Sequence, residues 1–227
     1  MRRFWPLAGL IVVVICLALA GCAPEEAPAE SYLAPYAPGL RRWTPQEEAE
    51  WALLPRYEIA ATLDVEALEL QGQEKVRFTN REDEELRDIY FRLYPNLPQQ
   101  GGRLTVRSVT ANGVPVNFET AAADTALRIK CDPPVAPHQV VELEIAFSAS
   151  IPDVEEGWVL FGRGENIISL PDFYPILAVY NAYGWHWDIP PAFADAGFAD
   201  AAFYQVWLTT RADQVIACTG RIVGQTP

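Results

Sequence analysis

The sequence contains few of the side chains that enzymes use to bind metals or to attack a substrate. Its 227 residues include only two histidines, His138 and His186, one methionine and four cysteines. The histidines lie 48 positions apart, and neither belongs to a His-Glu-x-x-His zinc motif. A Gly-x-Ser-x-Gly nucleophile motif and a phosphate-binding loop are also missing. The sequence therefore predicts no catalytic residue, no metal site and no cofactor in this protein segment.

Positive charge is also scarce. Lysine and arginine total 17, against 30 aspartates and glutamates, so the formal net charge is −13. Proteins that bind nucleic acid present a basic surface to the phosphates, which this composition does not supply. Removal of residues 1–21 would take away two arginines and no acid, leaving a net charge of −15. We therefore expect no nucleic-acid partner, and we expect anionic lipid to repel the surface unless an anchor holds it at the membrane.

The N-terminal segment has the features of an exported lipoprotein. Arg2 and Arg3 precede an apolar run over residues 4–20, and the small residue Gly21 stands before Cys22. A transmembrane helix needs about 20 apolar residues with suitable flanks, whereas a basic start, a short apolar helix and a small-residue exit are typical of an export signal. We expect a signal segment over residues 1–21, cleavage between Gly21 and Cys22, and lipidation of Cys22. Two or three acyl chains would then hold the protein on the extracytoplasmic side of the cell membrane.

Two cysteines remain outside this segment. Cys131 and Cys218 lie 87 positions apart, each within a run of alternating apolar residues. A disulfide between them is compatible with an oxidising compartment. Buried free thiols with raised pKa values are the alternative, because a sequence does not give the distance between two Cα atoms.

The sequence divides into a tether, a short helix and a β domain. Residues 22–43 are rich in alanine and proline, which favours an extended tether. Thr44-Pro45-Gln46-Glu47 has the pattern of a capping box with proline at the first helical position, so we expect a short helix over 44–55, ended by Pro55. The remaining residues, 56–227, are expected to form one β domain.

Alternation of apolar and polar residues supports the β assignment. The period of two recurs over residues 57–65, 76–78, 89–93, 127–131 and 141–147. Asn112-Gly113 separates two further strand-like runs, and both residues tolerate the positive φ of a tight hairpin turn. The predicted fold is all-β: an antiparallel β-sandwich or a pair of saddle-like curved sheets.

The segment from Trp158 to Trp207 is unusually rich in aromatic residues. Tyr183, Trp185 and Trp187 could form an aromatic loop that binds a peptide, a glycan or a partner protein. The interpretation we favour is that most of these rings fill the core and hold a long loop against it, because aromatic side chains dominate core burial.

Several stretches together resemble one known family. Residues 56–222 are similar to the N-terminal domain of aminopeptidase-N-like zinc metallopeptidases. The resemblance rests on segments in the family's order: Tyr57–Ile59, Ile89–Asn96, Leu170–Tyr180, Gly184–Asp188, Tyr204–Leu208 and Val215–Gly220.

The resemblance implies a saddle of β-sheets that precedes a thermolysin-like catalytic domain. That domain would bind zinc through His-Glu-x-x-His and a later glutamate, and would recognise the substrate's free amine with a Gly-x-Met-Glu-Asn segment. None of these motifs occurs here, so we expect zinc only in a catalytic domain C-terminal to Pro227.

Two functions are therefore compatible with the sequence. The protein is either the non-catalytic leading domain of a membrane-anchored metallopeptidase, or a surface β-domain that binds a ligand through aromatic loops. The first predicts an exposed apolar face where a further domain packs. The second predicts a closed surface with an aromatic groove.

Overall fold

The computed structural model describes residues 31–154, 160–191 and 197–226. The expected signal segment, the cleavage site at Gly21 and the lipidation site Cys22 lie outside the described residues. Within the described ranges, no helix has the length and hydropathy needed to cross a membrane.

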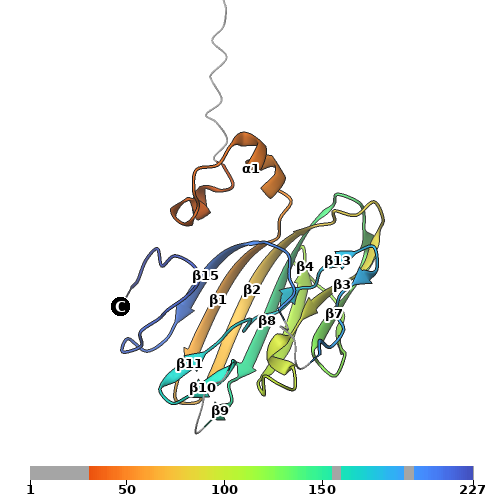
Figure 1. The fold of residues 1–227 in the computed structure, drawn as a ribbon. Helices are drawn as coiled ribbons and strands as arrows, with labels where there is room; N and C mark the ends of the chain where they lie inside the picture. Colours follow the sequence, from red (N-terminus) through yellow and green to blue (C-terminus); the bar gives the residue numbers. More distant parts are fainter. Residues whose placement is uncertain (1–30, 155–159, 192–196, 227) are drawn as a thin grey trace, which may run out of the picture.

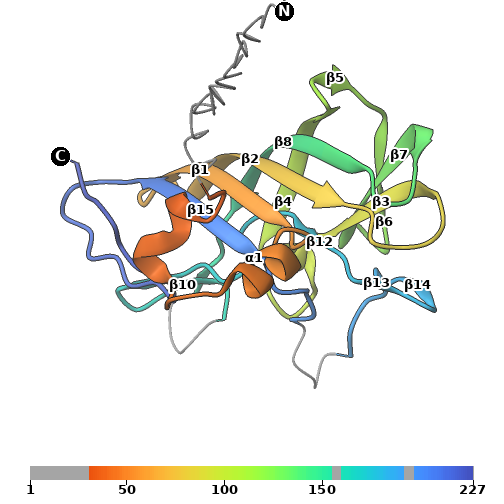
Figure 2. The ribbon, with the colours of Figure 1, turned by 90° about the horizontal axis from the view of Figure 1, so that it is seen from above.

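Among residues 31–55, two short helices precede the first strand. The 3-10 helix η1 spans Ala34–Gly39 and the α-helix α1 spans Pro45–Trp51. The predicted capping box is confirmed: the Thr44 hydroxyl accepts the amide of Glu47 at 3.2 Å, and the Glu47 carboxylate accepts the amide of Thr44 at 2.9 Å. Figures 1 and 2 show both helices at the end of the main sheet where its strand β1 begins.

The described part of the predicted tether is more ordered than expected. Leu33 is fully buried, and the ring of Tyr36 lies 4.9 Å from that of Phe203. The Tyr32 ring also stacks under the guanidinium of Arg56, whose Cζ is 3.8 Å from the ring centroid. These contacts fix the segment on the domain, although its proline content favours an extended conformation.

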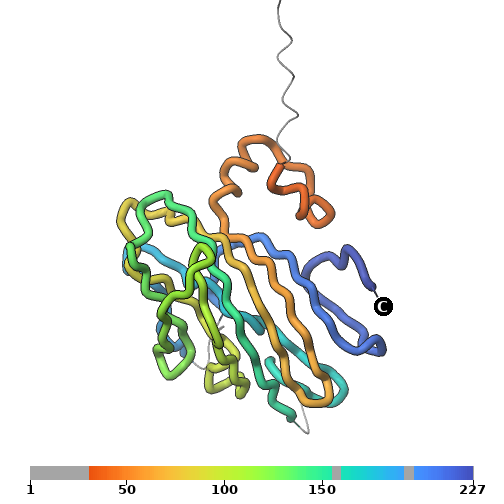
Figure 3. The backbone as a smooth tube through the Cα atoms, turned by 180° about the vertical axis from the view of Figure 1, so that it is seen from behind, coloured from red at the N-terminus to blue at the C-terminus, as the bar shows by residue number. Residues whose placement is uncertain are grey.

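The main sheet has six strands in the order β15-β1-β2-β8-β4-β5 (Figures 1 and 2). All neighbours are antiparallel except β15 and β1, which are parallel. The strands span Phe203–Thr209 (β15), Arg56–Asp64 (β1), Glu69–Thr79 (β2), Val140–Ser150 (β8), Arg103–Ala111 (β4) and Val114–Pro115 (β5). The tube in Figure 3 shows the outer face of this sheet, with no other segment crossing in front of β1, β2 and β8.

A second sheet covers part of the inner face. Its order is β12-β3-β7-β6, and its strands span Ile176–Leu177 (β12), Leu86–Arg92 (β3), Ala126–Val135 (β7) and Phe118–Ala121 (β6). Smaller pairings and the 3-10 helix η2 complete the fold: Asp153–Val154 (β9), Gly162–Gly164 (β10), Ile167–Ser169 (β11), Tyr180–Asn181 (β13), Gly184–Trp185 (β14) and Tyr94–Asn96 (η2). The all-β prediction is therefore confirmed.

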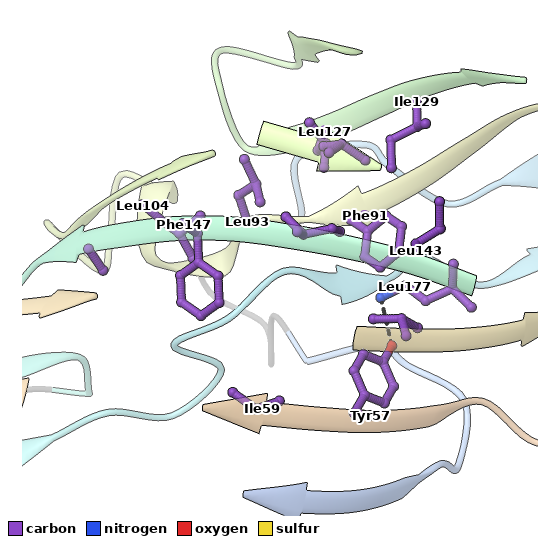
Figure 4. Close-up of a cluster of buried hydrophobic side chains, with 14 of the residues drawn as sticks. Tyr57, Ile59, Phe91, Leu93, Leu104, Leu127, Ile129, Leu143, Phe147 and Leu177 are labelled. Carbon is purple, nitrogen blue, oxygen red and sulfur yellow. Dashed lines mark hydrogen bonds between the residues drawn. The ribbon is translucent and has the colours of Figure 1, made fainter. Parts of the chain in front are cut away.

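The core lies between the two larger sheets (Figure 4). Inward side chains of β1, β2 and β8 pack there against those of β3 and β7, and all of the labelled residues are buried. Burial of apolar surface at roughly 25 cal/mol per Å² is the main force that holds the two layers together. One hydrogen bond crosses the cluster: the amide of Leu177 donates to the Tyr57 hydroxyl at 3.0 Å.

The predicted Asn-Gly hairpin is also confirmed. Asn112 and Gly113 connect β4 to β5, with φ values of 49° and 78°. This pair of positive φ angles matches the twist of the flanking strands, which is why the dipeptide favours a tight turn.

Candidate interaction surface

Strand β15 forms one edge of the six-stranded sheet. It pairs with β1 on one side and with no other strand of the described residues on the opposite side. Its seven residues include no charged side chain and no proline. Natural edge strands are commonly protected by charges, prolines or bulges, so β15 lacks the usual protection.

The register with β1 assigns the side chains of β15 to the two faces of the sheet. Tyr204 pairs with Tyr57 and Val206 with Ile59, which places both on the inner face. Trp207 lies on the outer face. Val206 is 49% exposed and Trp207 is 55% exposed, so apolar surface is left uncovered on both faces of this strand.

The segment after β15 adds further exposed apolar side chains. Val215 is 98% exposed, and Ile216, Ile222 and Val223 are also exposed. Seven of the fifteen large exposed hydrophobic residues in the described ranges therefore fall within twenty consecutive positions. We call this set the C-terminal apolar strip: Tyr204, Val206, Trp207, Val215, Ile216, Ile222 and Val223.

A fully buried carboxylate lies in the core near Tyr204, the first residue of the C-terminal apolar strip. Glu74 of β2 is paired with Ile59 across the sheet. Neither of its carboxylate oxygens has a hydrogen-bond partner within the described ranges, and burial raises its pKa well above the usual value. Glu74 shares the inward phase of Val76 and Phe78, so the alternation held the signal for its burial, although the strand expected at residues 76–78 does not include it.

Two tyrosines, Tyr57 and Tyr204, lie near this carboxylate, and Tyr174 packs against both of them. The rings of Tyr57 and Tyr204 stack at 4.7 Å, and Tyr174 meets both edge-on at 5.8 and 5.9 Å. Burial raises the pKa of all three hydroxyls. The cluster therefore stays uncharged, and it joins β1 and β15 to the segment that precedes β12.

A buried arginine of β3 holds the segment that follows β14 against the domain. Arg92 is 5% exposed, and its Nη1 donates to the carbonyl oxygens of Asp188 at 2.6 Å and His186 at 3.4 Å. Its Nε and Nη2 have no hydrogen-bond partner among the residues that the structure describes. Burial lowers the pKa of this guanidinium. Local alternation does not predict this burial, since Arg92 has the phase opposite to the buried Ile89 and Phe91 and is covered by a distant segment.

The expected aromatic loop is only partly exposed. Trp185 packs against the core, near Phe78 and Tyr90, and Trp187 stacks on Tyr90 at 5.6 Å. Tyr183, at the tip of the β13–β14 hairpin, is 93% exposed. Two of the three rings, those of Trp185 and Trp187, therefore pack against the domain, and only the Tyr183 ring is exposed enough to contact a ligand.

The two cysteines are free thiols in the structure. Cys131 is half-buried, and burial raises its pKa to about 11. Cys218 is exposed and lies outside any strand, because Val215–Gly220 forms an irregular segment in place of the buried apolar run that its alternation favours. The structure thus holds the two cysteines as separate thiols.

The histidines lie in separate parts of the fold. His138 occupies the turn before β8 with φ 61°, whereas His186 follows β14. No group of three or more histidine, cysteine, aspartate or glutamate side chains in the described ranges could hold a metal ion. The described residues therefore do not fit the zinc site that the family resemblance implies for a catalytic domain.

Comparison with models of known protein families gives no match, and comparison with curated proteins finds no relative. Solved structures do give similarities. One is an M1 zinc metallopeptidase from Deinococcus radiodurans, with a TM-score of 0.48 and 17% sequence identity, covering 77% of this chain and 36% of that chain. A mutant of this peptidase bound to a Tyr-Ser-Ala substrate gives a TM-score of 0.49 at 16% identity with the same coverage.

A two-domain M1 zinc metallopeptidase mutant bound to L-arginine is similar to the same degree, with a TM-score of 0.48 and 17% identity. The sequence described here spans 36% of the length of each of these proteins. What they have in common with it is a similarity of fold at low sequence identity.

Proposed function

We propose that this polypeptide is the non-catalytic N-terminal domain of a membrane-anchored, aminopeptidase-N-like zinc metallopeptidase. In this proposal Cys22 carries the lipid anchor, and a catalytic domain C-terminal to Pro227 holds the zinc and performs the hydrolysis. The role of the N-terminal domain is to support the catalytic domain and to form one wall of its cleft.

The observation that carries the proposal is the C-terminal apolar strip. Exposed apolar surface concentrated on one side of a domain is typical of a face that packs against a partner. Val206 and Trp207 lie on the two faces of an uncharged edge strand, and Val215 is almost fully exposed. A neighbouring domain would cover this surface.

The arrangement of the family-like segments also supports the proposal. The Tyr57 hydroxyl accepts the Leu177 amide, and the Tyr57 ring stacks on Tyr204. Arg92, in the Ile89–Asn96 segment, donates to the carbonyl of Asp188 in the Gly184–Asp188 segment. Stretches far apart in the sequence that resemble the family therefore contact one another, as expected if they are packing determinants of one fold.

The alternative, a ligand-binding surface domain, has less support. Its aromatic groove would need Trp185 and Trp187 to face outward, whereas both pack on Tyr90. Only Tyr183 of the three is strongly exposed.

The proposal is tested by measuring the mass of the native polypeptide in membranes of the source organism. An antibody raised against residues 56–222 would detect this polypeptide. A species much larger than 25.3 kDa, whose sequence contains His-Glu-x-x-His, is the expected result. A species of that mass or slightly less would overturn the proposal in favour of a lipid-anchored binding domain.

A second test concerns catalysis. The purified 227-residue protein, supplied with zinc, should not hydrolyse aminoacyl amide substrates above a matched blank. Turnover that a chelator abolishes would contradict the non-catalytic role.

A further inference from the structure

Among the described residues, one edge of β15 pairs with no strand, and a single hydrogen bond shows which residues direct their backbone groups toward that edge. The amide of Phe203 donates to the carbonyl of Pro55 at 2.9 Å, so Phe203 faces β1. Main-chain groups of successive residues in a strand point to alternate edges. Gln205, Trp207 and Thr209 therefore also face β1, while Tyr204, Val206 and Leu208 direct their N–H and C=O groups away from the sheet.

These outward groups form a template for another strand. Unpaired N–H and C=O groups on an uncharged, proline-free edge readily accept a further strand, and side-chain alternation gives such pairing its specificity. The side chains on the two faces of the edge, Val206 and Trp207, are about half exposed. An added strand would cover apolar surface on both faces while it satisfies the free backbone.

The segment that follows β15 does not occupy this edge. A turn closes with the amide of Gln214 donating to the carbonyl of Arg211 at 3.2 Å, and its central residues, Ala212 and Asp213, do not have positive φ. Turns of this hand splay the flanking strands, whereas hairpins use the mirror-image types. Arg211 also pairs with Glu66 in the β1–β2 loop, which fixes the turn there.

The same segment returns to the start of β15. The Arg221 side chain donates to the carbonyl of Pro38, in the helix η1 that packs on Phe203. Figures 1 and 3 show this return alongside the strand. A connection between parallel strands needs a dozen or more residues, and the return provides that length. The backbone is thus brought to the end of β15 from which a parallel neighbour would begin.

We propose that the free edge of β15 pairs with a strand that follows Pro227 in a longer polypeptide, so that the sheet continues into the next domain. The inference rests on the proposed function, because that function supplies the next domain. The added strand would pair with Tyr204, Val206 and Leu208 and place apolar side chains next to Val206 and Trp207.

Hydrogen exchange with single-residue resolution tests this pairing. The protein ending at Pro227 is compared with the longer native polypeptide. The amides of Tyr204, Val206 and Leu208 should exchange about 100-fold more slowly in the longer polypeptide. The amides of Gln205, Trp207 and Thr209 face β1 and should be protected in both, which provides an internal control.

A pair of variants of the longer polypeptide sharpens the test. Val206→Lys places a charge on the inner face beside the added strand and should restore fast exchange at Tyr204 and Leu208. Gln205→Lys places the same charge on the outer face and should leave the protection unchanged.

Three outcomes of the exchange experiment would contradict the proposed pairing. A longer polypeptide in which the three outward amides remain unprotected would overturn the inference and leave the proposed function standing. Absence of a longer polypeptide would remove both. Protection of these amides in the protein ending at Pro227 as its concentration rises would show pairing with a second copy, and would overturn the assigned partner.

Discussion

At the residue scale, Glu74 is an ionisable side chain that is fully buried in an apolar core. A carboxylate without hydrogen-bond partners in an apolar core is disfavoured in its charged form, and its pKa is raised accordingly. The folded state therefore holds a proton that the unfolded state releases. Between the unfolded pKa, about 4.3, and the raised folded pKa, stability falls as pH rises.

The substitution Glu74→Met tests this pH dependence, because it keeps the length of the side chain and removes the carboxyl group. At pH 8 the variant should be more stable than the original protein by about 1–3 kcal/mol, because it does not bury a group that tends to ionise. Its advantage should shrink toward pH 4. Denaturant unfolding from pH 4 to 8 measures the difference, with Gln73→Met on the outer face as control. An advantage independent of pH would show that the pKa of Glu74 is not raised in the folded state.

The two free thiols should differ in reactivity. A protein produced without residues 1–22 retains only Cys131 and Cys218. Because the Cys131 pKa of about 11 lies two units above the usual 9, its thiolate fraction at pH 7.5 is lowered about 100-fold. Maleimide labelling followed by mass spectrometry should modify the exposed Cys218 first and Cys131 far more slowly. Labelling of neither residue until a reductant is added would indicate a disulfide.

At the element scale, the packing of the Phe147 ring of β8 over β2 depends on Gly72. A Cβ at this position would lie 2.3 Å from Cζ of the Phe147 ring. The ring occupies the space above the glycine and fills the core beside the buried Ala61.

Gly72→Ala should therefore destabilise the protein by about 1–3 kcal/mol, the usual cost of overpacking a core. Phe147→Leu should lose stability through a cavity, yet the double variant should be more stable than the sum of the two losses predicts. Unfolding of all four proteins completes this double-mutant cycle. Additive losses would show that the alanine is accommodated without displacement of the ring.

The sequence allowed local elements to be predicted better than distant pairings. Alternation revealed β1, β7 and β8, the Asn112-Gly113 turn was identified from its φ preference, and the capping box marked α1. The parallel pairing of β15 with β1 could not be predicted, because the partners are far apart in the sequence. Strands of two or three residues, such as β13 and β14, have no periodicity to detect and depend on tertiary contacts.

The sequence predicted that an apolar surface would be exposed, but not which residues would form it. An exposed apolar face was expected for a leading domain, but alternation in Val215–Gly220 suggested burial of Cys218, and the structure exposes it. A period of two shows which residues share a face of a strand, and it does not show whether that face has a partner. Arg92 illustrates the converse, because the segment around Asp188 that covers it is distant in the sequence.

At the scale of the whole molecule, the net charge opposes the membrane attachment that the proposed function requires. The protein has a net charge of −13, so electrostatics alone would keep it away from anionic lipid. In the proposed function, attachment therefore depends on acyl groups, each methylene of which contributes about 0.8 kcal/mol when buried. The lipid on Cys22 should therefore account for nearly all membrane binding.

Cys22→Ser should move the protein from the membrane fraction to the soluble fraction. Cys16→Ser, within the same N-terminal segment, should leave it in the membrane and serves as the matched control. Fractionation with immunoblotting, at low salt and at about 1 M salt, makes the measurement, and salt should not release the unsubstituted protein because acyl anchoring is not electrostatic. If the Cys22→Ser protein stayed with the membrane in both salts and the native protein also retained residues 1–21, an uncleaved apolar segment at residues 4–20 would be the anchor, and the lipoprotein assignment would be wrong.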